Sequence, residues 1–245
     1  MQALPAETMR TDTEIDLIRH ARHGDPFSVL GPHTVLDGRC WLRAFLPGAT
    51  HVVAVDAVDG ATLAPLLLLH VDGLFEGALP ALPAAGYRLQ VRWADGNQSV
   101  IDDPYRFAPV LGELDVWLMG EGTHLRPYEV LGATPREFEG VQGTAFAVWA
   151  PNAARVSVVG DFNLWDGRRH PMRLRRECGV WEIFLPGVGG GARYKYEVLS
   201  REGELLPLKA DPYALQSELR PATASVVAQM PPVAPASPAR QRANA

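Results

Sequence analysis

The sequence contains little cysteine and no long run of apolar residues or of charge of one sign. Its two cysteines, Cys40 and Cys178, fall in what read as different domains, so we expect free thiols in a reducing compartment and no disulfide framework. The best apolar run, Leu66 to Leu69, is too short to cross a bilayer, and the N-terminus at Met1 lacks a signal-peptide pattern. With a net charge of −5, the chain lacks the excess of basic residues that would indicate nucleic-acid binding. These absences predict a soluble cytoplasmic protein without a membrane or nucleic-acid partner.

Turn chemistry, by contrast, is plentiful. The 23 glycines and 21 prolines are scattered along the chain, which predicts many short strands rather than long helices. A length of 245 residues with 47% hydrophobic residues is enough for two globular domains. In the N-terminal segment, 1–24, early acids and late basic residues on a helical stripe predict a short helix over 13–22. The proline- and alanine-rich end, 228–245, predicts a disordered tail.

An internal repeat is the chief architectural feature of the sequence. The repeated segments keep their order at a spacing of about a hundred residues, which is typical of one β-sandwich domain. Among them are Asp25–Gly31 with Arg126–Gly132, Tyr87–Val91 with Tyr194–Val198, and Asp103–Tyr105 with Asp211–Tyr213. We therefore predict an all-β fold of two tandem sandwiches, residues 25–110 and 126–227, joined by a packed linker over 111–125.

A polar loop in the second copy holds the first candidate for a functional site. The predicted half-buried strand Val156–Val159 is followed by Gly160 and then by a loop that contains Trp165. This tryptophan either closes the end of the sandwich core or offers a face to a flat, partly apolar partner such as a pyranose ring. In the second case, the groups that pair with the sugar hydroxyls are Asp161, Asn163, Arg168 and Lys195. The first copy has no aromatic residue at this place.

Several ordered blocks of the sequence resemble bacterial glycogen branching enzymes (1,4-α-glucan branching enzymes). The blocks are Gly120–His124, Val156–Arg175, Tyr194–Glu197, Leu208–Ala214 and Arg220–Val227. The resemblance covers roughly residues 16–227 and implies two immunoglobulin-like sandwiches, the second similar to family-48 carbohydrate-binding modules. In that family a (β/α)₈ barrel of the α-amylase superfamily follows and carries the catalytic carboxylates. This sequence shows no barrel pattern after Val227.

The resemblance also implies roles for single residues. In related modules the tryptophan that ends the Gly-x-Phe-Asn-x-Trp loop stacks on a glucose ring, which points to Trp165. A lysine in the Tyr-Lys-Tyr strand contacts hydroxyls, which points to Lys195. The strongest binders have a second stacking tryptophan after that strand, whereas Glu202–Pro207 contains no aromatic residue. We expect weak binding, because each stacked ring adds only about 1 kcal/mol beyond the burial of its area.

Catalytic and metal-binding constellations are scarce. The pair Asp102-Asp103 precedes a proline and is assigned to turn chemistry, not to the two carboxyls of a retaining glycosidase. His20 and His23, with His33 nearby, are assigned to a partly exposed helix end and not to a metal site. We therefore expect no catalytic residue, no metal and no cofactor in this chain, and no transfer of glucan segments by it alone.

The remaining tryptophans are assigned structural roles. Four of them alternate with apolar residues and are predicted to lie in the two cores: Trp41, Trp93, Trp149 and Trp181. Trp117, in the linker, is predicted to hold the two domains together.

Two functions from different classes remain open at this point. In the first, the chain is the non-catalytic N-terminal half of a branching enzyme and binds or orients α-1,4-glucan in glycogen biosynthesis. In the second, it is a structural module that packs on a catalytic barrel and has little glycan affinity of its own. The expected partners are accordingly glycogen or another α-1,4-glucan, and a catalytic barrel that this sequence does not show.

Overall fold

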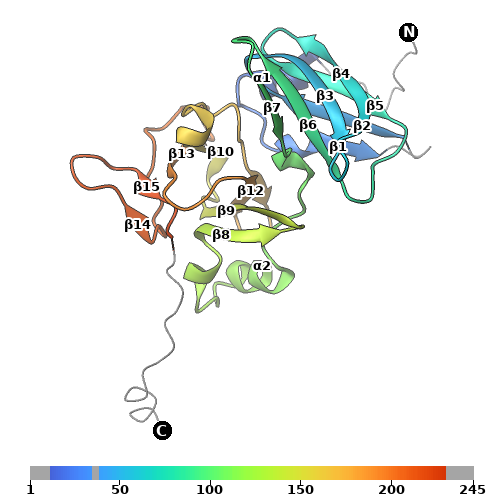
Figure 1. Ribbon diagram of the computed structural model, residues 1–245. Coiled ribbons are helices and arrows are strands. Elements are labelled where there is room, and N and C mark those ends of the chain that lie inside the picture. Colours follow the sequence, from blue (N-terminus) through green and yellow to red (C-terminus); the bar gives the residue numbers. More distant parts are fainter. Residues whose placement is uncertain (1–11, 35–38, 230–245) are drawn as a thin grey trace, which may run out of the picture.

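The computed structural model describes residues 12–34 and 39–229, and within them two all-β units follow one another along the chain (Figure 1). A short helix, α1 (Asp12–Arg19), precedes the first unit. It confirms the predicted helix but ends earlier than expected, because Ala21 adopts a left-handed backbone conformation with φ 49°. Ala228 and Gln229, the first two residues of the predicted tail, are ordered against the second sandwich, because Ala228 is buried and the Gln229 side chain donates to the carbonyl of Gly190 at 3.3 Å. The rest of the predicted tail and the first residues of the N-terminal segment lie outside the described residues.

The first sandwich is built from seven strands that form one continuous, folded sheet in the order β1-β2-β5-β4-β3-β6-β7. Strand β4 passes from one layer to the other, since Leu66 pairs with β3 and Leu67 pairs with β5. The strands are β1 (Gly31–Thr34), β2 (Cys40–Phe45), β3 (Ala49–Asp56), β4 (Thr62–His70), β5 (Leu74–Leu79), β6 (Tyr87–Trp93) and β7 (Gln98–Ile101), with the 3₁₀ turns η1 (Pro26–Ser28) and η2 (Pro104–Arg106).

The second sandwich has two separate four-stranded sheets, in the orders β10-β13-β15-β14 and β11-β12-β9-β8. Its elements are α2 (Glu113–Gly120), η3 (Pro127–Glu129), β8 (Gly132–Phe138), β9 (Val141–Trp149), β10 (Ala153–Gly160), η4 (Asp161–Asn163), β11 (Arg173–Arg175), β12 (Val180–Pro186), β13 (Arg193–Ser200), β14 (Gln216–Ser217) and β15 (Ser225–Val226). The tandem arrangement of two sandwiches confirms the predicted fold class.

Strand β10 differs from its prediction. The sequence predicts a half-buried strand, but all four residues from Val156 to Val159 have no exposed surface. Val156 and Val158 face the core of the second sandwich. On the other face, the Arg155 guanidinium lies against Ser157 and donates to its hydroxyl at 3.0 Å. The chain that folds back after the Trp165 loop pairs with the free edge of β10, where Ser157 is opposite Pro171.

The tryptophans only partly follow their predictions. Trp181 is buried in the second core, as predicted, and Trp93 is partly buried against the first. The core assignment of Trp149 is wrong, because this residue ends β9 beyond the covered part of the sheet and is 58% exposed. Trp117 is 59% exposed and does not join the domains, because α2 packs on the sheet through Val116 and turns the indole away.

Side chains of the second sandwich bond the backbone of the first sandwich and of the N-terminal segment that precedes it. Arg155 Nε donates to the carbonyl of Ala21 at 2.7 Å, and the Arg169 guanidinium donates to the carbonyl of Pro47 at 2.7 Å. The Arg173 guanidinium lies 3.8 Å from the centroid of the Phe27 ring. These contacts fix the orientation of one sandwich relative to the other.

The connection between the sandwiches is also held at its start. Glu182 Oε2 on β12 accepts hydrogen bonds from the amides of Val110 and Leu111 at 2.9 and 2.7 Å. The Arg175 guanidinium donates to the carbonyl of Leu111 at 3.1 Å and lies 3.4 Å from Glu182. The chain is therefore fixed where it leaves the first sandwich.

Candidate functional site

The loop that follows β10 is set by a close approach of two backbones. A side chain at Gly160 would meet the carbonyl oxygen of Arg193 and the ring of Phe162, so only glycine fits there. The 3₁₀ turn η4 begins immediately after it. This turn directs the following residues out of the sandwich.

Asn163 fastens the loop to the end of the strand. Its Oδ1 accepts from the amide of Gly160 at 2.9 Å, and its Nδ2 donates to the carbonyl of Val158 at 2.9 Å. The Nδ2 also lies 2.9 Å from Nδ1 of His170, which accepts as a neutral imidazole because burial lowers the pKa of His170 to about 3. Asn163 is thus buried with its amide fully used.

The two residues after the turn are held in an unfavourable backbone conformation. Leu164 and Trp165 have φ values of 60° and 59°, in the left-handed region that costs a residue with a side chain about 1 kcal/mol or more. The amide of Trp165 donates to the carbonyl of Gly160 at 3.0 Å and closes the loop. Backbone strain of this kind is concentrated at binding sites, where the surrounding structure enforces it.

Trp165 is held at the surface, half-buried, and it belongs to neither hydrophobic core of the two sandwiches. Its indole Nε1 donates to Asp161 Oδ1 at 3.1 Å. Asp161 in turn accepts two bonds from the Arg193 guanidinium, at 2.7 and 3.1 Å. These bonds from Arg193 lower the pKa of Asp161, so the carboxylate stays ionised and keeps the indole in place.

Lys195 lies on the same face of β13 as Arg193, because side chains two residues apart on a strand point the same way. Its Nζ donates to Thr223 Oγ1 at 2.7 Å, and the Arg193 guanidinium lies 3.3 Å from Glu218 Oε1. The structure thus assembles an exposed row of charged and hydroxyl groups beside the tryptophan. Of the predicted residues, Trp165, Asp161 and Lys195 belong to this row.

Sequence reasoning missed three members of the row: Arg193, Glu218 and Thr223. Arg193 had a usable signal, since it lies two residues before Lys195 on a predicted strand. Thr223 had none, because 28 residues separate it from Lys195 along the chain.

Arg168 lies apart from the row. Its guanidinium forms two bonds to Asp166, at 2.9 and 2.8 Å, at the far end of the loop. Between them, Gly167 packs so closely on the Glu197 carboxylate that a side chain there would overlap it. The return limb of the loop therefore lies directly on β13.

The residues considered for catalysis and metal binding have other partners. Asp103 accepts from the Tyr87 hydroxyl and from the amide of Tyr105, and Asp102 pairs with Arg106. Within residues 12–34 and 39–229, no group of three or more histidines, cysteines or acids is arranged to hold a metal ion. In the same residues, no helix is long and apolar enough to span a membrane.

The fold and the exposed loop define a class: a pair of β-sandwiches of which the second carries the features of a carbohydrate-binding module. Residues 130–214 match the family described as carbohydrate-binding module 48 (isoamylase N-terminal domain). Residues 11–105 match the N-terminal domain of the alpha-1,4-glucan branching enzyme GlgB. The chain therefore belongs to the GlgB branching-enzyme family, of which it represents the N-terminal region.

Two curated relatives agree with this assignment. The chain is 58% identical over 215 residues to the 1,4-alpha-glucan branching enzyme GlgB of Paramagnetospirillum magneticum, covering 88% of this chain and 28% of that protein. It is 56% identical over 219 residues to the enzyme of the same name from Rubrobacter xylanophilus, covering 89% of this chain and 30% of that protein. The chain thus spans less than a third of the length of these relatives.

Among solved structures, the chain is similar to a pullulanase from Anoxybacillus sp. LM18-11, with 16% identity and a TM-score of 0.34. The match covers 81% of this chain and 27% of that one.

Proposed function

We propose that the second sandwich binds α-1,4-glucan on Trp165 and that the chain orients this glucan in glycogen biosynthesis. The observation that carries the proposal is the position of the Trp165 indole, which is half-buried at the surface and fixed through Asp161 to Arg193. An indole held this way presents a flat apolar face in a constant orientation. The apolar C–H face of a pyranose ring is the complement of such a surface.

The groups around the indole are suited to sugar hydroxyls. Lys195 and Thr223 offer an ammonium group and a hydroxyl on one side, and Asp161 offers a carboxylate on the other. In this proposal, Asn163 positions the loop and Arg168 stabilises its far end through Asp166, so both support binding without lying under the sugar. A single stacking platform gives weak binding.

Affinity electrophoresis in gels that contain glycogen tests the proposal. We expect the intact protein to be retarded and the Trp165→Ala variant to run as it does without glycogen. Trp117→Ala is the matched control, because Trp117 is also an exposed tryptophan, 59% exposed, but lies on α2. Equal migration of the intact protein with and without glycogen would refute glucan binding, and equal retardation of the Trp165→Ala variant would refute the assigned site.

Catalysis is not part of the proposed role. The carboxylates Asp102 and Asp103 are engaged in ion pairing and in holding the turn η2, which leaves neither placed to attack a sugar. Incubation of the chain with amylose should leave the iodine stain unchanged. A shift of the stain toward that of branched glucan would show that the chain transfers segments by itself.

The free, buried thiols of Cys40 and Cys178 support a cytoplasmic location.

A second function, a docking module for a catalytic domain, is favoured by one specific observation. In the first sandwich, Phe27 on η1 packs against the second sandwich. Its counterpart in the repeat is Tyr128 on η3, which is 59% exposed. The surface that the first sandwich uses to hold its successor is therefore open on the second sandwich, where the catalytic part of a full-length relative can pack.

Sedimentation of the chain mixed with the catalytic part of the Paramagnetospirillum magneticum enzyme tests this second function. Complex formation that Tyr128→Ser weakens and Trp165→Ala leaves intact would support docking through this surface. The absence of a complex at micromolar concentrations would contradict it.

A further inference from the structure

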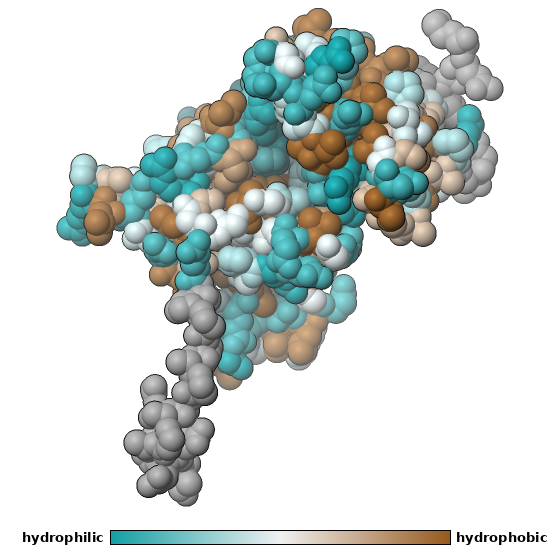
Figure 2. Space-filling model, viewed as in Figure 1, coloured by the Kyte–Doolittle hydropathy of each residue, from teal (hydrophilic) through white to brown (hydrophobic). Residues whose placement is uncertain are grey.

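A cleft of about 860 Å³ lies between the two sandwiches. The first sandwich contributes the β2–β3 turn and the β6–β7 hairpin, and the second contributes the Trp165 loop and the end of β12. Figure 2 shows the surface hollowed between the two lobes, with apolar residues along its edge. The volume falls in the range of sites that enclose small ligands.

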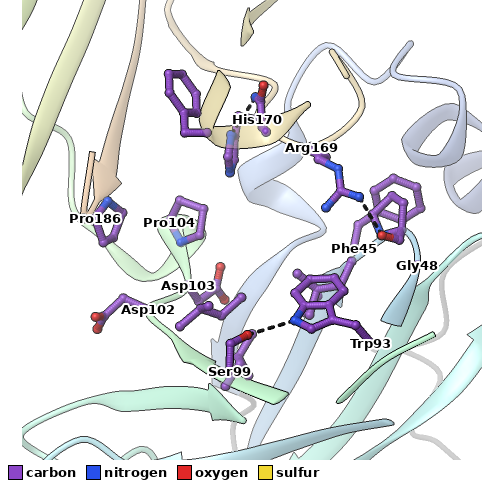
Figure 3. Close-up of a pocket in the computed structure, with 18 of the residues that line it drawn as sticks. Phe45, Gly48, Trp93, Ser99, Asp102, Asp103, Pro104, Arg169, His170 and Pro186 are labelled. Carbon is purple, nitrogen blue, oxygen red and sulfur yellow. Dashed lines mark hydrogen bonds between the residues drawn. The ribbon is translucent and has the colours of Figure 1, made fainter. Parts of the chain in front are cut away.

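Trp93 provides an aromatic surface in this cleft. It ends β6, and its Nε1 donates to Ser99 Oγ on the neighbouring strand at 2.9 Å, which fixes the orientation of the indole (Figure 3). Pro186 and His170 of the second sandwich lie across the cavity from it (Figure 3). Flat and apolar surfaces therefore line both sides.

Carboxylates and amides are the polar side chains on the first-sandwich side, apart from the hydroxyls of Ser99 and Tyr105. Asp95 accepts from the backbone amide of Asn97 at 2.9 Å and from its side-chain amide at 2.7 Å, so both groups are held at the tip of the hairpin. Gln98 and Asp102 line the cleft further along. An indole flanked by fixed carboxylate and amide groups is the combination that recognises a polyhydroxylated ring.

The charge of the lining is unfavourable for an anionic ligand. The arginine that lines the cleft, Arg169, donates to the carbonyl of Pro47 and closes one end of the cavity (Figure 3). His170 accepts from Asn163 as a neutral ring. Among the described lining residues, the carboxylates of Asp95, Asp102 and Asp103 outnumber this guanidinium, and Asp102 is itself paired with Arg106 at 3.1 Å. The cleft therefore has no excess of positive charge to bind phosphate.

The cleft and the glucan site proposed above share one loop. Leu164 lines it and is 77% exposed, although it is apolar and held in the left-handed conformation. The next residue is Trp165, so a single loop contacts both places. Leu164 costs free energy twice, through its exposed apolar surface and through its left-handed backbone. Contact with a ligand would bury the side chain and so offset the cost of its exposure.

We infer that the cleft between the sandwiches is a second carbohydrate site, built by both domains, which takes a short segment of a neutral α-1,4-glucan. The choice of glucan as ligand rests on the function proposed above, whereas the cavity, its indole and its charge stand independently of Trp165.

A titration of the ¹⁵N-labelled chain with maltoheptaose, followed by amide chemical shifts, tests the inference. We expect the amides of Asn97 and Gly187 in the cleft to shift saturably, and to do so equally in the Trp165→Ala variant. The amide of Gly122, in the linker, serves as the reference that does not move. Trp93→Phe should raise the half-saturation concentration of the cleft amides about threefold to tenfold, since a smaller ring stacks less well.

The outcomes separate the two sites. If the amides of residues 161–168 shift and those of Asn97 and Gly187 do not, the second site is refuted and the Trp165 site stands. If the cleft amides shift alone, the cleft binds glucan and the Trp165 site is refuted. If neither set shifts in the folded protein, both are refuted. Displacement of maltoheptaose from the cleft by inorganic phosphate would overturn the assignment of a neutral ligand.

Discussion

The hydroxyl of Tyr194 donates a 2.6 Å hydrogen bond to Asp211 Oδ2, and a bond of the same length joins Tyr87 to Asp103 in the first sandwich. In both copies the second carboxylate oxygen accepts from the backbone amide two residues further on. Each sandwich thus ties its last long strand, β6 or β13, to a turn that follows it. The residues that form this bond, a tyrosine and an aspartate, stand at equivalent positions in the two copies of the sequence repeat.

Replacing the tyrosines should affect the two sandwiches unequally. In Tyr87→Phe, Asp103 Oδ2 loses its side-chain donor, which we expect to cost about 1–3 kcal/mol of stability. In Tyr194→Phe, Asp211 keeps a second donor, the Tyr196 hydroxyl at 3.2 Å, and the loss should be smaller. Urea unfolding at pH 7 measures both values. A greater loss in Tyr194→Phe than in Tyr87→Phe would contradict this account.

The half-buried His170 should make stability fall in mild acid. Its pKa is about 3 in the folded protein against 6.5 ordinarily, so only the unfolded chain takes up a proton as the pH falls below 6.5. Its contribution is complete above pH 6.5 and is lost as the pH falls from there toward 3. Between pH 7 and 5 we expect a loss of about 2 kcal/mol, which His170→Gln should not show.

Asp103 acts in the opposite direction and has to be separated from this effect. Burial raises its pKa to about 6, so its contribution is complete below pH 3.8 and is lost as the pH rises through 6. Because the wild type and His170→Gln both keep Asp103, the difference between their urea-unfolding curves across this pH range reports His170 alone. A constant difference would show that His170 titrates in the folded protein as it does in the unfolded chain.

Arg155 should matter much more than the exposed Arg193. The Arg155 guanidinium bonds Glu197 at 2.8 Å and the carbonyl of Ala21 at 2.7 Å, and both ionised side chains are largely buried. Arg155→Ala leaves the Glu197 charge buried without its partner and should cost about 3 kcal/mol or more. Arg193→Ala removes an exposed pair with Asp161 and should cost under about 1 kcal/mol. Thermal or urea unfolding of the two variants decides; similar losses would contradict the argument.

Leu164→Asn should exchange function for stability. Asparagine tolerates the left-handed conformation, so the variant should gain about 1 kcal/mol in the free energy of unfolding. It should also bind maltoheptaose more weakly in the cleft, where it removes an apolar contact. Urea unfolding and the amide titration check the two effects. A variant that is no more stable and binds equally well would show that the left-handed conformation of Leu164 costs no stability and that its side chain adds nothing to binding.

The fold was predictable because the sequence repeats its turn and strand chemistry in order. On β6, burial alternates from Tyr87 to Arg92, as period-2 patterning requires. The burial predictions fail where a neighbouring segment covers a strand, as on β10, or where that cover stops, as at Trp149. Trp149 sits in an apolar, alternating segment, but α2 covers the sheet only up to that residue and leaves its indole outside.

The candidate site was predictable in part. The loop motif singled out Trp165. Asn163 was expected to pair with sugar hydroxyls, but its amide instead bonds the backbone of Gly160 and Val158 and fixes the loop. The pairing of Lys195 with Thr223 depends on strand β15 lying beside β13, which no local pattern encodes. The cleft was out of reach for the same reason, because its lining comes from both sandwiches.

The fastening of the first residues after the first sandwich has a mechanical consequence. With the amides of Val110 and Leu111 bound by Glu182, and with Arg155 and Arg169 bound to the opposite lobe, no free joint separates the two halves. A polymer that pulls on one lobe therefore swings the other through the same angle. The two sandwiches therefore move as one rigid body, and a domain joined to the chain after β15 turns with them.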